Sequence, residues 1–100
     1  MPEAPAITWS DIDRLIHEPA RLLIMANLAA VESADFLFLM NMTGLTQGNL
    51  SSHLTRLEKR GYIAIKKEFK GRRPHTKVSI SAEGKRVFDR YAELMKKVLV

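Results

Sequence analysis

The sequence predicts a single, mainly α-helical domain that carries one small β-hairpin. Three observations lead to this prediction. The chain has 100 residues, which is enough for one domain and too few for two. Apolar residues recur at helical spacing over most of its length. Only residues 62–81 alternate between apolar and polar side chains as strands do, and a turn containing glycine and proline divides them.

The composition excludes several classes of protein. The apolar fraction of 46% and the charged fraction of 27% are typical of a soluble globular chain. The longest nearly apolar run, residues 22–31, has about half the length that a bilayer crossing needs. The absence of cysteine excludes disulfides and cysteine-ligated metals. The first residues carry no basic group before an apolar stretch, as a secretory signal would. We therefore expect a cytoplasmic protein without a membrane partner.

The N-terminal third is predicted to be a short tail followed by two helices. Residues 1–9 contain two prolines and are expected to form a flexible segment before a domain at residues 10–100. Ser10 can cap a short first helix, whose apolar face comprises Ile12, Leu15 and Ile16. Pro19 can open a second helix that runs to Glu32. Because this second helix is apolar nearly all round, we expect it at the centre of the core.

Two further helices follow with a tight turn between them. A third helix is predicted at residues 36–42, capped by Ser33 or Asp35 and ended by Gly44. A fourth is predicted at residues 47–60, with Thr46 as its cap and Gly61 beyond its end. Two helices joined by so short a turn form a helix-turn-helix pattern.

The C-terminal part is predicted to be a hairpin and a long helix. The strands are expected at residues 62–69 and 76–81, and residues 70–74 form the tip between them. Ser81 can cap a last helix at residues 82–100. The predicted order is therefore four helices, two strands and a fifth helix.

Positive charge is concentrated in the second half of the chain. Residues 1–50 carry a net charge of −4 and residues 51–100 a net charge of +9, so the whole chain carries +5. Between residues 56 and 77, nine basic residues face only two acidic ones. Such an asymmetry is typical of a protein that binds a polyanion, although a solvated basic surface that aids solubility remains an alternative.

The fourth helix has a face suited to DNA. Leu50, Leu54 and Leu57 lie within about 60° of one another and must face the core. The opposite face has no carboxylate and no large apolar group. It consists of Gly48, Asn49, Ser52, Thr55, Arg56 and Lys59, with Gln47, Ser51 and His53 on its flanks. Small hydrogen-bonding side chains can approach base edges, and the helix N-terminus favours phosphate. His53 lies beside the leucines, so a structural role is at least as well supported as a base contact.

The predicted hairpin is strongly basic. Its first strand places Ile63, Ile65 and Phe69 on one face and Lys66 and Glu68 on the other. Its cationic side chains are Lys66, Lys67, Lys70, Arg72, Arg73, His75 and Lys77. Long cationic side chains on a protruding hairpin can reach phosphates, and an arginine at the tip can enter a minor groove. Protection of an exposed edge strand accounts for Lys66 and Lys67 but not for the arginines at the turn.

These features resemble a winged helix-turn-helix domain of the MarR/ArsR-like transcriptional regulators, in the compact branch of about 100 residues. The resemblance covers residues 10–95. It rests on the run Thr43-Gly-Leu-Thr-Gln-Gly-Asn-Leu-Ser-Ser-His-Leu-Thr-Arg-Leu-Glu-Lys-Arg-Gly-Tyr-Ile, the wing Lys70-Gly-Arg-Arg-Pro and the segment Val78-Ser-Ile-Ser-Ala-Glu-Gly.

The resemblance implies a homodimer on double-stranded DNA. The recognition helix at residues 47–60 would enter the major groove, and the basic wing at residues 70–75 would contact the backbone or minor groove. The implied DNA-binding residues are Gln47, Asn49, Ser51, Ser52, Thr55, Arg56, Lys59, Lys70, Arg72 and Arg73. Without cysteine, a thiolate metal switch like that of metal-sensing relatives is out of reach.

The last helix favours a dimer for an independent reason. It carries two adjoining apolar stripes: Val87, Tyr91, Leu94 and Val98, then Phe88, Ala92, Met95 and Leu99. One stripe can cover the core of its own chain, and the second is free for a partner subunit. The alternative is that a small core consumes both stripes.

We therefore expect a sequence-specific DNA-binding transcriptional regulator. The alternative is a winged-helix adaptor that binds another protein and not DNA. An enzyme is not expected, because the sequence contains no paired carboxylates, phosphate-binding glycine loop or nucleophile-and-base motif. His17, His53 and His75 share no ligand-like spacing, so we expect neither a metal site nor a cofactor.

Overall fold

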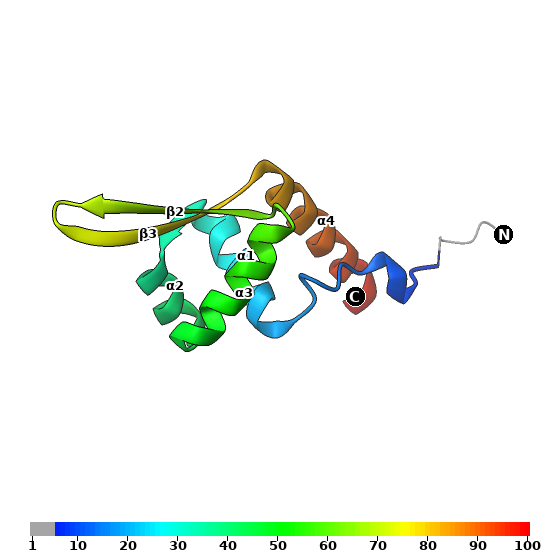
Figure 1. The fold of residues 1–100 in the computed structure, drawn as a ribbon. Helices are drawn as coiled ribbons and strands as arrows, with labels where there is room; N and C mark the ends of the chain where they lie inside the picture. The colour runs from blue at the N-terminus through cyan, green and yellow to red at the C-terminus, as the bar shows by residue number, and fades with distance from the viewer. Residues whose placement is uncertain (1–5) are drawn as a thin grey trace.

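The computed structural model describes residues 6–100 and shows a mainly helical domain from which one β-hairpin protrudes (Figure 1). Residues 1–5, the greater part of the predicted flexible segment 1–9, lie outside the described residues. A short 3-10 helix, η1 (Trp9–Asp11), comes first. The elements that follow are α1 (Pro19–Val31), β1 (Ser33–Asp35), α2 (Phe36–Thr43), α3 (Gln47–Lys59), β2 (Ile63–Lys70), β3 (Arg73–Ile80) and α4 (Ala82–Leu99). The predicted fold class is confirmed.

The core forms around α1, as its apolar composition predicts. Ile24, Met25 and Leu28 of α1 are fully buried. The other elements each add buried side chains, namely Leu39 from α2, Leu50, Leu54 and Leu57 from α3, Ile63 and Val78 from the hairpin, and Tyr91 from α4. The leucine stripe of α3 is therefore on the core side, and its polar face is on the outside.

The prediction of a first helix is wrong. Only η1 is helical there, and Thr8 caps it in place of Ser10: the Thr8 backbone N–H donates to the Asp11 carboxylate over 2.8 Å. Asp13 then competes with helix formation, because its carboxylate accepts the backbone N–H groups of Leu15 and Ile16 over 2.9 and 3.1 Å. Ile16 still reaches the core, but from a turn.

A third strand was not predicted. β1 pairs antiparallel with β3, Ala34 opposite Val78, so the sheet order is β1-β3-β2. A three-residue strand carries almost no periodic signal and is held by its pairing with β3. The remaining caps agree with the prediction, since Asp35 accepts from the backbone of Phe38 at the start of α2.

The hairpin tip is tighter than predicted. Lys70 pairs with Arg73, so the turn consists of Gly71 and Arg72 alone. Gly71 has a φ of 65°, which fits a two-residue turn with glycine at its first central position. The second strand accordingly begins at Arg73, and Pro74, which was expected in the tip, lies inside it. Below, the wing means the whole β2–β3 hairpin.

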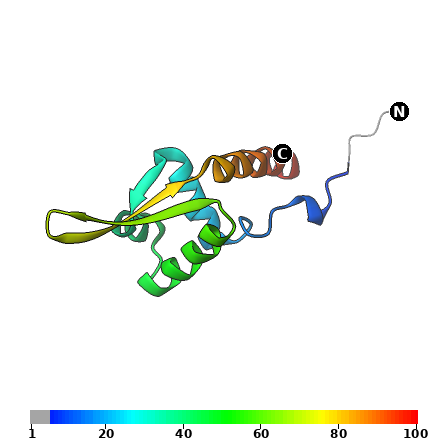
Figure 2. The same ribbon diagram turned by 45° about the horizontal axis from the view of Figure 1, so that its top comes forward.

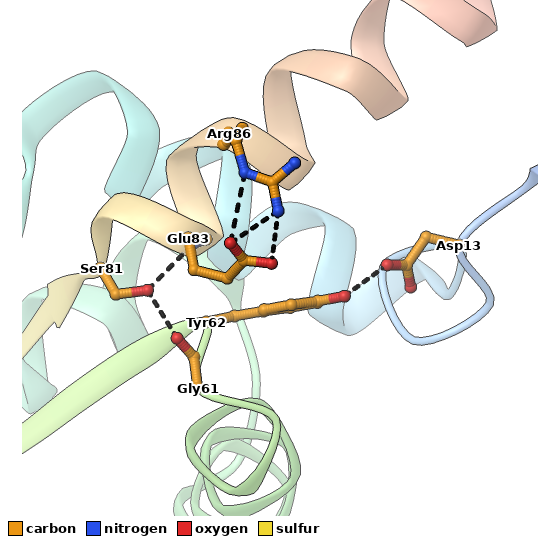
Figure 3. A network of polar contacts seen from close by, with 7 residues as sticks. Asp13, Gly61, Tyr62, Ser81, Glu83 and Arg86 are labelled. Atoms are coloured by element: carbon orange, nitrogen blue, oxygen red, sulfur yellow. Dashed lines mark hydrogen bonds and ion pairs between the residues drawn. The ribbon is translucent and has the colours of Figure 1, made fainter.

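A polar junction joins the base of the wing to α3 and α4 (Figure 3). The Ser81 hydroxyl donates to the carbonyl of Gly61 over 2.6 Å and accepts the N–H of Gly84 over 2.9 Å. The Tyr62 hydroxyl donates to the Asp13 carboxylate over 2.6 Å. These contacts tie together the end of α3, the start of β2 and the start of α4.

Candidate nucleic-acid interface

The outward face of α3 is open to solvent. Burial of Leu50, Leu54 and Leu57 determines the rotation of the helix about its axis. All seven predicted contact residues on α3 are exposed: Gln47, Asn49, Ser51, Ser52, Thr55, Arg56 and Lys59. The three on the wing, Lys70, Arg72 and Arg73, are exposed as well. Within one chain, all ten predicted side chains are therefore available to a ligand.

A groove of about 580 Å³ runs between α3 and the wing. On the α3 side it is lined by Gln47, Ser51, Leu54, Thr55 and Glu58, and on the wing side by Ile65, Lys67 and Thr76, with Phe36 of α2 beside them. One flank of the polar face of α3 and one face of the wing therefore adjoin a single concave surface. Both ribbon views show the wing extending from the end of the molecule that holds α2 and α3 (Figures 1 and 2).

The predicted residues divide between this groove and its surroundings. Gln47, Ser51 and Thr55 line the groove. At 100° per residue, Ser52 and Lys59 point almost directly away from the core. Asn49 lies on the flank away from the wing, on the side of His53. The structure thus brings part of the predicted set to one groove and leaves the rest on the outer surface of α3.

The two faces of the wing differ, and Lys67, which the sequence explains by protection of an edge strand, lines the groove. Strand alternation places Ile63, Ile65, Lys67 and Phe69 on the face toward α3. Lys70 lies on the opposite face, where it lines a second hollow with Glu68, His75 and Lys77. The alternation that puts Ile63 and Ile65 on one face of the strand also puts Lys67 there, but only the structure shows that this face adjoins α3.

The cations of this surface are not neutralised within the chain. In the part of the chain that the structure describes, lysine and arginine form ion pairs at Lys66, Lys85, Arg86 and Lys96. No such pair among residues 6–100 involves Arg56, Lys59, Lys67, Lys70, Arg72 or Arg73. Their positive charge is therefore free to interact with an external anion.

His53 has a structural contact. Its Nδ1 lies 3.0 Å from the guanidinium of Arg21, a side chain that is only 7% exposed. Because a guanidinium can only donate, Nδ1 is the acceptor and the proton of the neutral ring is on Nε2. Arg21 also donates to the carbonyl of Leu15. The Glu18 carboxylate accepts the backbone N–H of Arg21, and this hydrogen bond lowers the pKa of Glu18. The group joins the start of α1 to the middle of α3.

The other histidines also have local partners. Nδ1 of His17 lies 2.6 Å from the Tyr91 hydroxyl, and Nε2 of His75 lies 3.5 Å from the Asp35 carboxylate. Among residues 6–100, no group of three or more His, Asp and Glu side chains could hold a metal ion. None of the helices described is long and apolar enough to cross a membrane.

Comparison with known proteins identifies the class to which this fold and surface belong. Residues 20–99 match the family described as the winged helix DNA-binding domain. An uncharacterized protein of Methanocaldococcus jannaschii is 32% identical over 78 residues, which are 78% of this chain and 85% of that protein. The chain belongs to the winged helix DNA-binding domain family.

Solved structures give the same result. A transcriptional regulator homologue of Pyrococcus horikoshii is 32% identical, covers 87% of this chain and 86% of its own, and superimposes with a TM-score of 0.83. A MarR-family transcriptional regulator of Silicibacter pomeroyi shares the fold, with a TM-score of 0.68, 24% identity and coverage of 84% of this chain and 56% of its own. The chain thus shares the fold of a MarR-family regulator, as its sequence predicts.

Proposed function

We propose that this protein is a sequence-specific transcriptional regulator that binds double-stranded DNA as a homodimer. In this proposal, α3 enters the major groove while the wing follows the adjacent backbone and minor groove. The observation that carries it is the shared groove: Gln47, Ser51 and Thr55 of α3 and Lys67 of the wing line one open surface, together with the Glu58 carboxylate. Phosphate contacts from lysine and arginine supply affinity, and the small polar side chains of α3 supply sequence choice.

The end of the molecule away from the wing supports a homodimer. Leu99 is 79% exposed, and Val98, Trp9 and Ile7 are exposed apolar side chains as well. Both views place the end of α4 and η1 at this end (Figures 1 and 2). A partner seated there covers apolar surface and leaves α3 and the wing of both subunits free. Two subunits would then read half-sites about one helical turn apart.

The dimer can be tested by its mass. Sedimentation or light scattering is expected to show a dimer for the native chain and a monomer after Val98→Asp with Leu99→Asp. Both positions are exposed within one chain, so the charges should not disturb the subunit fold. A native chain that is monomeric at micromolar concentration would contradict the homodimer while leaving monomeric DNA binding open.

DNA binding is tested by mobility shift over a range of salt concentrations. If about six to eight phosphates are contacted per dimer, the slope of log affinity against log salt is about −5 to −7. Arg72→Ala with Arg73→Ala should weaken binding to every duplex. Substitution of Ser52 or Arg56 should instead change which sequences are preferred, as selection from a random library will show.

An adaptor that binds only protein gives the opposite result. It would show no duplex binding at low salt, and its α3 or wing would contact another protein in a pull-down. Absent or salt-insensitive duplex binding therefore rejects the proposed regulator.

A further inference from the structure

Phe69 stands out on the wing. It is 73% exposed, more than any other aromatic side chain among residues 6–100. It lies two residues before the turn, on the part of the hairpin that extends beyond the helical body (Figure 1). β1 reaches β3 only at residues 77–79, so the third strand does not cover this part of the wing. Nothing else within residues 6–100 buries the ring.

Phe69 and Pro74 form an apolar pair across the two strands. They are register partners, one step from the Lys70–Arg73 pair that flanks the turn. In a two-residue hairpin the pair beside the turn is hydrogen-bonded, and the next pair is not; its side chains approach more closely. This position also suits a proline, which has no N–H to donate. We call these two residues the wing-tip apolar pair.

This pair lies on the same face of the wing as the groove. Alternation places Phe69 with Ile65 and Lys67, and both of these line the groove beside α3. At about 3.3 Å per residue, Phe69 lies roughly 7 Å farther along the strand than Lys67. A backbone strand contacted by Lys67 would therefore separate the groove read by α3 from the groove reached by Phe69.

The surroundings of the pair are cationic. Residues 66–77 contain six lysines and arginines and one glutamate. The wing tip therefore combines an exposed apolar ring with charges that attract a polyanion. Proteins that bind the minor groove use this combination, with cations on phosphates and an apolar side chain that partly unstacks a base step.

We propose that the wing-tip apolar pair is a minor-groove wedge, in which Phe69 inserts against the deoxyriboses and a base step next to the major groove occupied by α3. The proposal rests on the DNA binding proposed above and adds a distinct contact to it. The wedge reads how easily the flanking step opens, so it favours flexible pyrimidine–purine steps at positions that α3 does not touch.

The test separates affinity from unstacking. The probe is an alternating A·T duplex of about three helical turns. It carries 2-aminopurine at several adenine positions and a fluorophore at one end. Binding of the native chain, followed by anisotropy, should raise 2-aminopurine fluorescence. Phe69→Ala should weaken binding about 5- to 100-fold and abolish the rise. Phe69→Leu, which keeps an apolar wedge, should retain part of both effects.

Leu23→Ala is the matched control. Leu23 is an exposed apolar residue of α1, outside the proposed interface, and its replacement should change neither signal. Because the Phe69 side chain is exposed, its variants should keep the native fold, and circular dichroism will verify this.

Three outcomes would overturn the wedge. If the native chain binds the duplex without a rise in fluorescence and Phe69→Ala binds equally well, the wedge is rejected while the proposed function stands. If Phe69→Ala loses only binding to vesicles of anionic phospholipid, the ring contacts lipid. If the native chain does not bind the duplex at low salt, both the wedge and the proposed function fail.

Discussion

Gly84 of α4 packs directly on the main chain of Tyr62. A Cβ added at Gly84 would overlap the Tyr62 carbonyl oxygen and lie 2.8 Å from the carbonyl carbon. The same oxygen accepts the N–H of Ser81 over 3.0 Å. Since Tyr62 immediately precedes β2, this close approach determines how α4 meets the base of the wing.

Gly84→Ala should therefore destabilise the fold although alanine is the better helix former. The added methyl group must push α4 away from Tyr62, and such overpacking costs about 1 to 3 kcal/mol of the free energy of unfolding. Urea denaturation will measure the decrease. Gly48→Ala is the matched control, because a Cβ at Gly48 would meet no atom within 4 Å. Equal stability of the two variants would contradict this account.

Gly48→Ala should separate stability from DNA affinity. Gly48 is a helical residue on the exposed face of α3, and its replacement by alanine should raise the free energy of unfolding by about 0.5 to 1 kcal/mol. The methyl group points toward the space that the duplex would occupy, so binding should weaken. Urea denaturation and duplex titration of one preparation test both effects. A variant that is more stable and binds the duplex equally well would show that the DNA does not approach Gly48 closely.

Tyr62 should make stability depend on pH in the alkaline range. Burial, together with the hydrogen bond to Asp13, raises the pKa of Tyr62 from 10.0 to about 12. Below pH 10 the hydroxyl is neutral in both states, and its contribution to stability is complete. Between about pH 10 and pH 12 the unfolded chain loses this proton more readily, so stability falls as pH rises.

Urea midpoints at a series of alkaline pH values will measure this dependence. Tyr62→Phe should remove the Tyr62 share and also lower stability at neutral pH by about 1 kcal/mol, since the Asp13 carboxylate loses a donor. Burial raises the pKa of Tyr91 as well, so some alkaline dependence should remain. An unchanged pH profile in Tyr62→Phe would contradict the assignment.

Lys67 and Lys66 should differ in their contributions to DNA binding. They are neighbours in β2, but Lys67 lines the groove beside α3 while Lys66 lies on the opposite face, 3.9 Å from Glu68. Lys67→Ala should weaken all duplexes and reduce the magnitude of the salt slope by about 1 for each phosphate that the variant no longer neutralises. Lys66→Ala should leave the slope nearly unchanged. Equal effects would contradict this distinction between Lys67 and Lys66.

Much of the fold follows from local signals. The caps at Asp35, Thr46 and Ser81 each bond the backbone N–H of the third residue after them, as their positions predict. The sequence-based predictions that were wrong have a common cause. The first helix does not form because Asp13 bonds its own local backbone, and β1 exists only because β3 pairs with it. Short segments are decided by competing interactions that periodicity does not register.

In the candidate site, too, some features follow from the sequence and others from the tertiary structure. The sequence by itself determined which face of α3 is polar and exposed, because the leucine stripe has one low-energy orientation on a core. It also determined where the wing turns and where positive charge accumulates. Only the tertiary structure decided that the face of the wing bearing Lys67 and Phe69 turns toward α3, while Lys70 turns away. That choice depends on how β2 leaves the junction at Tyr62 and Gly84, which lie 22 residues apart in sequence and are brought together by packing.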